Sequence, residues 1–177
     1  MSETIKRLDE LMQKYGKMAE QVANEAMGRA VGASTKMIQG EAKLLCPVDH
    51  GELRQSIKTR VETEEGRTIG VVYTNKSYAS YVEFGTGPKG EADHAGISPE
   101  VTPAYSQSPW WIHESQVDAE TAERYHWFYI DTPDGRFYQC SGQAAQPFMY
   151  PALKNNEDRA VRNIRNYLAR EIRKACE

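Results

Sequence analysis

The first quarter of the chain carries its longest regular pattern, and that pattern constrains the fold more than any other feature. Apolar residues recur there at steps of three or four, the spacing that places them on one face of an α-helix. They are Ile5, Leu8, Leu11, Tyr15, Met18, Val22, Ala26, Ala30, Ala33 and Met37. We therefore expect a long amphipathic helix as the first element.

Four glycines and one proline modify this helix. Gly16, Gly28, Gly32 and Gly40 lie inside the pattern, and a glycine in a helix interior costs about 1 kcal/mol relative to alanine. We expect the helix to bend or break near one of them. Pro47 should end it, because proline lacks the backbone N–H and disfavours a helical conformation in the residue before it.

Two hairpins are predicted from runs of strand-forming residues. Ile57–Thr63 and Arg67–Thr74 alternate or carry β-branched side chains, and a Glu-Glu-Gly turn separates them. Trp127–Ile130 should pair with Phe137–Cys140 across a Thr-Pro-Asp-Gly turn.

Shorter elements are expected between the hairpins. Tyr78–Phe84 is predicted to be a short helical or irregular segment. Residues 85–108 are rich in Gly, Pro, Ser and Asp without a sustained apolar period, which predicts a long, mobile surface loop. Trp110–Ile112 should begin another strand, and Asp118 should cap a short helix that runs through Tyr125.

The final element is a second helix, with Pro151 in its first turn and an apolar face downstream. That face consists of Val161, Ile164, Leu168 and Ile172. The order of elements predicts an α+β fold, in which long N-terminal and C-terminal helices pack on a mostly antiparallel β-sheet. A chain of 177 residues suits one domain with elaborations.

Composition narrows the classes of function. The formal net charge of −3 and the pI near 5.9 argue against general affinity for nucleic acids or membrane surfaces. No stretch approaches the roughly 18 apolar residues needed to cross a bilayer, and the polar amino terminus does not resemble a signal peptide. We therefore expect no membrane partner.

The cysteines predict neither disulfides nor a metal site. Cys46, Cys140 and Cys176 are an odd number at wide spacing, which fits a reducing compartment such as the bacterial cytoplasm. Cys46 and His50 form one close Cys/His pair, but a zinc site needs a second pair. We expect neither a metal nor a cofactor.

One glycine-rich segment can be compared with phosphate-binding loops, which use clustered backbone amides and a lysine. Residues 85–90 read Gly-Thr-Gly-Pro-Lys-Gly. Lys89 precedes the last glycine, and no helix is expected to follow, so a flexible loop is the better interpretation.

Asp49, His50 and Glu52 contain the usual proton-transfer groups. An aspartate just before Gly51 is also ordinary turn chemistry, because its carboxylate accepts nearby backbone amides. We favour this capping role over an acid/base or metal cluster.

Other chemistry-bearing residues receive structural interpretations. His94, His113, His126 and Cys140 lack a spacing or a neighbouring base that would indicate catalysis. An aromatic group is expected to form a small core or an interface rather than a sugar or base platform: Trp110, Trp111, Tyr125, Trp127, Phe128 and Tyr129. The last helix has an excess of bases, which we interpret as a solvated face with ion pairs rather than a surface for DNA: Arg159, Arg162, Arg165, Arg170, Arg173 and Lys174.

Three segments together carry a family resemblance. Cys46–Ile57 contains Pro-Val-Asp-His-Gly-Glu-Leu-Arg-Gln-Ser-Ile, Tyr78–Thr86 reads Tyr-Ala-Ser-Tyr-Val-Glu-Phe-Gly-Thr, and Gln146–Ala152 contains Pro-Phe-Met-Tyr-Pro-Ala. In this order the segments resemble the signatures of siphophage tail-completion or head-to-tail joining proteins, including minor tail protein Z-like members. His50 replaces the threonine that is usual in the first signature.

The resemblance covers residues 1–86 and 144–177, and it makes residues 87–143 an insertion within one domain of residues 1–177. It assigns structural rather than catalytic roles to the signature residues, which are Pro47, Asp49, Gly51, Leu53, Arg54, Ser56, Tyr78, Tyr81, Glu83, Phe84, Gly85, Thr86, Pro147, Phe148 and Pro151. Gly51 and Gly85 should allow tight turns, and Arg54 should pair with Glu83. We also expect Leu53, Ile57, Val82 and Phe84 to pack the helix against the sheet.

The resemblance implies a non-enzymatic virion protein of a tailed phage or prophage. It would complete the tail or join it to the head, as one subunit of a ring, expected to be a hexamer, around the DNA channel. Its partners would be copies of itself and other neck and tail proteins, with non-specific proximity to DNA, and it would be in the host cytoplasm during assembly.

Other functions stay open at this point. Within the class, the chain could be a neck adaptor, a stopper or a tail terminator. A metal-dependent hydrolase or nuclease would need Asp49, His50 and Glu83 to converge on one pocket. A DNA-binding factor would use the basic last helix and show steeply salt-dependent binding.

Overall fold

The computed structural model describes residues 3–175, and these residues confirm the α+β class. Two long helices lie at the ends of the described chain, and every paired strand is antiparallel to its neighbour. The chain divides into two compact units. Unit 1 comprises Met1–Leu44, Ile57–Thr74 and Ala152–Glu177, and unit 2 comprises Leu45–Ser56 and Asn75–Pro151.

Helix α1, Glu3–Leu45, is a single helix of 43 residues. The expected break at a glycine does not occur. A Cβ at Gly16, Gly28 or Gly40 would meet no other atom within 4 Å. Each of these glycines therefore destabilises the helix only through its low helix propensity, by about 1 kcal/mol. The packing of the helix against the rest of unit 1 offsets this loss. The helix ends just before Cys46-Pro47, as proline dictates.

The buried face of α1 differs from the predicted one. Ala26 and Ala30 are buried, but the face continues through Val31, Ser34 and Thr35, whereas Ala33 is exposed. The two hydroxyl groups tolerate burial because each finds an acceptor: Thr35 donates to the Val31 carbonyl and Ser34 to the Ala160 carbonyl. Val22 is exposed. The side chains of Leu8, Leu11, Tyr15 and Met18, with Ile5, lie outside the described part.

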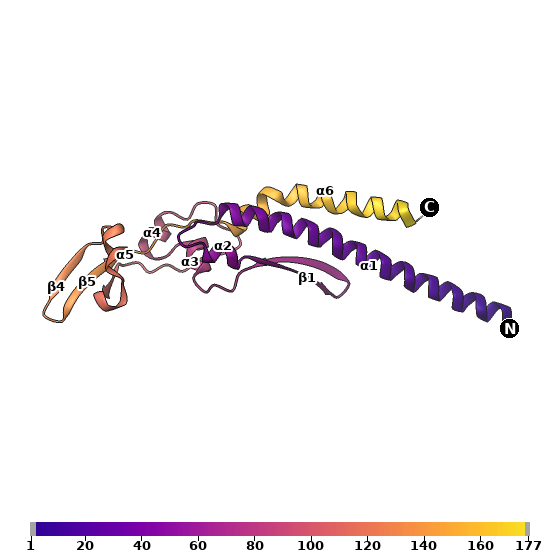
Figure 1. Ribbon diagram of the computed structural model, residues 1–177, viewed down its shortest axis with the longest axis horizontal. Coiled ribbons are helices and arrows are strands. Elements are labelled where there is room, and N and C mark those ends of the chain that lie inside the picture. The colour runs from indigo at the N-terminus through magenta and orange to yellow at the C-terminus, as the bar shows by residue number, and fades with distance from the viewer. Residues whose placement is uncertain (1–2, 176–177) are drawn as a thin grey trace. The chain divides into compact units, whose positions relative to one another are not determined.

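Strands β1, Lys58–Glu64, and β2, Arg67–Tyr73, form the predicted hairpin of unit 1 and lie along α1 (Figure 1). The turn uses Glu65 and Gly66, both with positive φ, which matches the right-handed twist of the strands. Gly70 is pressed against α1, because a Cβ there would lie 1.9 Å from Thr35 Oγ1. The hairpin is a two-stranded sheet that depends on the helix for a packing surface.

Helix α6, Met149–Ala175, belongs to unit 1 from Ala152 onward and runs beside α1 there (Figure 1). Ala152 and Asn156 are buried, Ala160 is half-buried, and Asn163 lies near Met37 with Nδ2 3.6 Å from Sδ. Alanine and asparagine side chains spaced three or four apart therefore form the contact face. The predicted apolar face is only partly used, since Ile164 and Leu168 are half-buried but Val161 and Ile172 are 52% and 63% exposed.

Unit 2 is made of short elements. Helices α2, Glu52–Ser56, α3, Ala79–Phe84, and α4, Gly87–Ala92, come first. They are followed by β3, Trp110–His113, the 3₁₀ turn η1, Glu114–Gln116, and α5, Ala119–Arg124. Strands β4, Tyr129–Thr132, and β5, Gly135–Cys140, complete a sheet in the order β3-β5-β4.

Several predictions for unit 2 are confirmed. The second hairpin pairs Tyr129 with Tyr138 and Ile130 with Phe137. Asp118 caps α5 by accepting the Thr121 N–H at 2.8 Å. The expected loop of residues 85–108 is wrong in its first part, because residues 87–92 form α4 with Gly87 and Gly90 buried. Residues 93–109 lack regular structure, as predicted.

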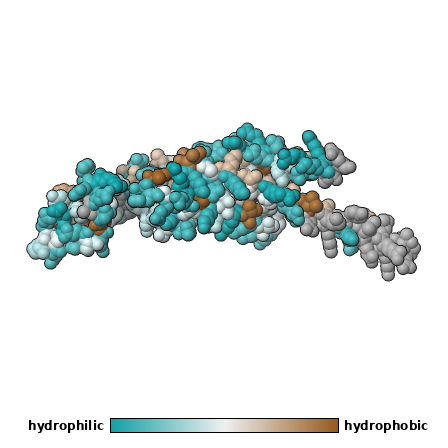
Figure 2. Space-filling view, viewed as in Figure 1, coloured by the Kyte–Doolittle hydropathy of each residue, from teal (hydrophilic) through white to brown (hydrophobic). Residues whose placement is uncertain are grey.

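The described helices include none that is both long and apolar enough to cross a membrane. On the face that Figure 2 presents, apolar residues appear as separate spots on a mainly hydrophilic surface.

Candidate functional site

The first signature segment folds into a turn followed by α2. Gly51 has φ +81°, a conformation that favours glycine, and its carbonyl accepts the Gln55 N–H at 3.0 Å. Leu53 and Cys46 are buried. Burial raises the pKa of the Cys46 thiol, against the opposing effect of the Arg54 charge. The segment thus holds a turn in place, with Cys46 and Leu53 inward and Val48 51% exposed.

Glu83 of the second signature is the central anchor of unit 2. Its side chain is 5% exposed and comes from α3. Oε2 accepts the N–H groups of Phe148 and Met149 at 2.8 and 2.9 Å, and Oε1 accepts that of Tyr150 at 3.0 Å. These donors are the free N–H groups at the start of α6, where a negative charge also complements the helix dipole. The second and third signatures are therefore joined by one carboxylate.

This arrangement replaces the predicted pair of Arg54 and Glu83. Arg54 instead donates from Nη2 to the Cys46 carbonyl at 3.1 Å. The sequence pattern places both residues in signatures, but it does not show that three backbone N–H groups donate to the Glu83 carboxylate. Phe148, whose N–H is one of these donors, is completely buried.

The glycine-rich segment after Glu83 packs backbone against backbone. Gly85 has φ +76°, and a Cβ there would lie 2.8 Å from Ala145 N. A Cβ on Gly142 would lie 1.9 Å from the Thr86 carbonyl oxygen. Thr86 and Gln143 exchange two backbone hydrogen bonds of 2.9 and 3.1 Å. The glycines therefore serve close approach rather than flexibility, and the one sequence signal is the presence of glycines beside both partners of this bridge, which are 57 residues apart.

A half-open pocket of about 530 Å³ lies over the first signature. Its walls combine the turn from Pro47 to Leu53 with Tyr78 and Val82 of the second signature, and with Tyr125, Gln143 and Gln146. A neighbouring pocket of about 400 Å³ shares Tyr78, Val82 and Gln143 and adds Tyr81, Thr86 and Trp110. Signature residues and residues of the 87–143 segment thus line the same surface.

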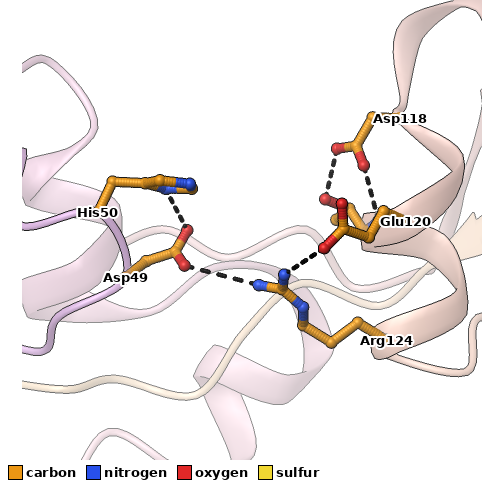
Figure 3. A network of polar contacts seen from close by, with 6 residues as sticks. Asp49, His50, Asp118, Glu120 and Arg124 are labelled. Atoms are coloured by element: carbon orange, nitrogen blue, oxygen red, sulfur yellow. Dashed lines mark hydrogen bonds and ion pairs between the residues drawn. The ribbon is translucent and has the colours of Figure 1, made fainter.

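Arg124 connects α5 to the first signature (Figure 3). Its guanidinium lies 2.9 Å from Glu120 and 3.5 Å from Asp49, and Asp49 also lies 3.0 Å from His50 Nδ1. These groups are well exposed, so water screens the attraction. Sequence reasoning misses the role of Arg124, because its partner Asp49 is distant along the chain.

The candidate acid/base residues Asp49, His50 and Glu52 line the same pocket, but Glu83 does not join them there. Asp49 and His50 pair with each other, whereas Glu52 binds Lys76 at 2.5 Å, which lowers the pKa of Glu52. Glu83 is occupied by backbone N–H groups. Within residues 3–175, no three potential metal ligands come together. The arrangement stabilises turns and helix ends.

The remaining candidates are dispersed. His94 donates from Nδ1 to the Gly90 carbonyl at 3.0 Å and stacks on Tyr105. His113 contacts Ser115 and the Asp134 carbonyl, and His126 has φ 49°. Cys140 pairs with Trp110 across the sheet, and Cys176 lies outside the described residues. The aromatic group is not a core, because most of its rings are more than a third exposed: Trp110, Trp111, Tyr125, Phe128 and Tyr129.

Comparison with known proteins gives one match. Residues 9–85 match the model of a family described as "Bacteriophage HK97-gp10, putative tail-component". No curated protein and no solved structure matches the chain. The matched stretch contains the first signature and the second up to Gly85, whereas Thr86 and the third signature lie beyond it. From α1 to the end of α3, the chain is therefore similar to a tail component of a bacteriophage.

Proposed function

We propose that the chain is a non-enzymatic virion protein that completes the phage tail or joins it to the head. Copies form a ring, a hexamer in the virion, around the channel through which DNA passes. The family match supports a tail component, and the finer role follows from the resemblance of the three signature segments. The whole chain acts as one functional domain, with residues 87–143 as an insertion.

The observation that most supports this proposal is the hydrogen bonding of the Glu83 carboxylate. Glu83 is the one acid in the second signature, and three backbone N–H groups occupy its carboxylate. A buried carboxylate engaged in this way is a structural anchor. Because Asp49 and Glu52 are also paired with neighbouring cations, the signature residues act as architecture, which disfavours the hydrolase and the nuclease.

The insertion supplies the contacts to neighbouring subunits or to the tail tube. Its exposed aromatic residues include Trp111, Tyr125 and Phe128, at 43%, 62% and 62% exposure. Large apolar side chains at a surface are typical of protein interfaces. An adaptor, a stopper and a tail terminator would use the same chemistry in a different ring.

The proposal is tested by deleting the gene and imaging the resulting particles by negative-stain electron microscopy. DNA-filled heads with separate tails, or tails of abnormal length, are expected. A plasmid copy of the wild-type gene should restore joined particles, and so should an Asp49→Asn, His50→Gln double variant. Normal infectious particles without the gene would refute the proposal, and failure of the double variant alone would favour an enzyme.

The role of the insertion has its own test. Deleting residues 87–108 should abolish infectious particles, since the loop contacts neighbours. Full-length, DNA-filled, infectious particles from this deletion would refute that part.

A further inference from the structure

Charge is unevenly distributed between the two units. Unit 2 contains five Lys and Arg residues against twelve Asp and Glu residues, a formal net charge of −7. Unit 1 contains the other seventeen bases against thirteen acids, a formal net charge of +4. The overall value of −3 conceals this separation. Two copies therefore attract each other when unlike units face each other, and repel when like units do.

The outward side of α6 is both apolar and basic. Val161, Arg165 and Ile172 are four and seven residues apart, so they share one side of the helix. Arg162 and Arg173 lie in the next row. The two apolar side chains are 52% and 63% exposed, and none of the three arginines forms an ion pair within residues 3–175. We call this set of five residues the α6 outer face.

A face of this composition suits a protein surface. Arginines bind carboxylates with a planar, two-pronged geometry. The exposed Val161 and Ile172 gain free energy only where a partner offers apolar area, and the phosphate backbone of DNA offers charge for the arginines alone.

Unit 2 contains a pocket with matching chemistry. It has a volume of about 460 Å³, and its lining combines apolar and polar residues, with Glu91 on its wall. The lining consists of Ile97, Pro99, Val101, Pro103 and Tyr105 together with His94, Ser98 and Thr102. Val101 is 40% exposed. The exposed Glu100 lies between two of the lining residues in the chain. We call this the loop pocket.

The loop pocket has a fixed wall, although it belongs to a segment without regular structure. Tyr105 donates its hydroxyl to the Phe84 carbonyl at 2.7 Å and stacks on His94 at 5.6 Å. Burial, and to a smaller extent the nearby Glu91 charge, raises the pKa of Tyr105. Gln107 donates to Glu91 at 3.1 Å, and this contact holds the carboxylate at the rim.

We propose that the α6 outer face of one copy docks on the loop pocket of the next copy. Val161 and Ile172 cover the apolar lining, and Arg162, Arg165 and Arg173 meet Glu91 and Glu100. This inference rests on the ring arrangement of the proposed function, and it names the two surfaces that form the contact.

The two surfaces are unlike, so the contact is head-to-tail and leaves one free surface of each kind at every added copy. A symmetric contact is disfavoured, because two outer faces would bring arginines together and two pockets would bring carboxylates together. Head-to-tail contacts of this kind form a ring when the rotation between successive copies closes.

Charge reversal tests the contact by sedimentation velocity of the purified full chain. One variant carries Arg162→Glu and Arg165→Glu, and a second carries Glu91→Lys and Glu100→Lys. Each reversal brings like charges together, so each variant alone should associate at least about tenfold more weakly than wild type. An equimolar mixture should associate again, because both types of junction then join opposite charges.

The matched control reverses two exposed bases elsewhere in unit 1, Lys58→Glu and Arg67→Glu, and should associate like wild type. The inference is overturned if wild type stays monomeric, if either variant associates like wild type, or if the mixture stays dissociated. It is also overturned if a short DNA duplex binds wild type but not the arginine variant while association of that variant is unchanged. Normal particles from a gene deletion would refute the proposed function but leave this sedimentation result standing.

Discussion

Unit 1 and unit 2 are held together in different ways. Unit 1 consists of two long helices and a hairpin, and most of its buried positions are small residues such as Ala30, Ala42 and Ala152, with Ile57 as the large exception. Unit 2 consists of helices of five or six residues and a short sheet. Its segments are joined by a buried carboxylate, by backbone contacts at glycines and by ion pairs at the surface.

The difference shows that a long helix needs fewer specific anchoring contacts than short helices need to hold their positions. A long helix repeats its contact every turn, so the loss of any one contact is small compared with the total. A six-residue helix is not stable alone, and its position depends on one or two groups that must be satisfied. Unit 2 should therefore respond sharply to single substitutions that unit 1 tolerates.

The largest loss in the free energy of unfolding is expected on substitution of Glu83. Replacement by alanine leaves three N–H groups at the start of α6 without their acceptor. Each buried donor left unsatisfied costs about 1–3 kcal/mol, so the free energy of unfolding should fall by at least about 3 kcal/mol. Denaturant titration followed by circular dichroism measures it. Glu83→Gln should lose less, because one carbonyl oxygen still accepts. Equal stability of Glu83→Ala and wild type would show that water replaces the anchor.

The next effect concerns the backbone contact at Gly142. Its φ is +79°, and a Cβ would meet the Thr86 carbonyl oxygen at 1.9 Å. Gly142→Ala should therefore destabilise the protein by about 1–3 kcal/mol from the left-handed conformation alone, with a further cost from displaced backbone. Gly66→Ala is the control, since Gly66 has a similar φ of +77° and open space around it. If both variants lose the same stability in thermal unfolding, the close approach is unimportant.

An effect of opposite sign is expected in unit 1. Gly40 lies inside α1, and a Cβ there would meet no other atom within 4 Å. Gly40→Ala should raise the free energy of unfolding by about 1 kcal/mol, because alanine has the higher helix propensity. Gly70→Ala, whose Cβ would strike Thr35, should destabilise instead. Both changes can be measured by denaturant titration. A loss of stability in Gly40→Ala would contradict the view that unit 1 tolerates substitution.

The smallest effect is local and depends on pH. Hydrogen bonds from the Thr121 side chain and backbone lower the pKa of Asp118 below its usual value of 3.8. A lowered folded pKa means that this cap contributes its full stability above pH 3.8 and loses it as the pH falls through the folded value. The protection factor of the Thr121 amide compares its hydrogen-exchange rate with that of an unfolded chain at the same pH. This factor should therefore fall in acid, and Asp118→Ala should remove the dependence. An unchanged acid dependence in the variant would assign it to another carboxylate.

Periodicity makes unit 1 largely predictable. The long helix, the hairpin with its turn and the final helix follow from apolar spacing and turn chemistry. The buried faces are less predictable: Ala33 is exposed and Thr35 is buried, because the hairpin approaches α1 at Gly70. Apolar spacing reports which side of a helix is apolar, but the partner decides which residues it covers.

In unit 2, the sequence predicts the contacts between residues that are close together in the chain, but it does not predict the contacts between distant residues. The Asp118 cap and the second hairpin depend on neighbours in sequence, and both are predicted correctly. The Glu83 anchor and the contact of Asp49 with Arg124 join residues far apart in the chain. Residue types alone do not reveal such pairs. Helix α4 escapes prediction because its glycines are typical of loops, and here they permit backbone contact.

The bridge between Thr86 and Gln143 has a consequence for how such a chain can change. Because the two stretches of backbone meet there, the segment of residues 87–142 begins and ends at one place. A segment whose ends already touch can be shortened, lengthened or exchanged for another at little cost to the scaffold that carries it. The bridge thus holds both ends of residues 87–142 at one point of unit 2, so a segment of another length can join the same two residues without moving them.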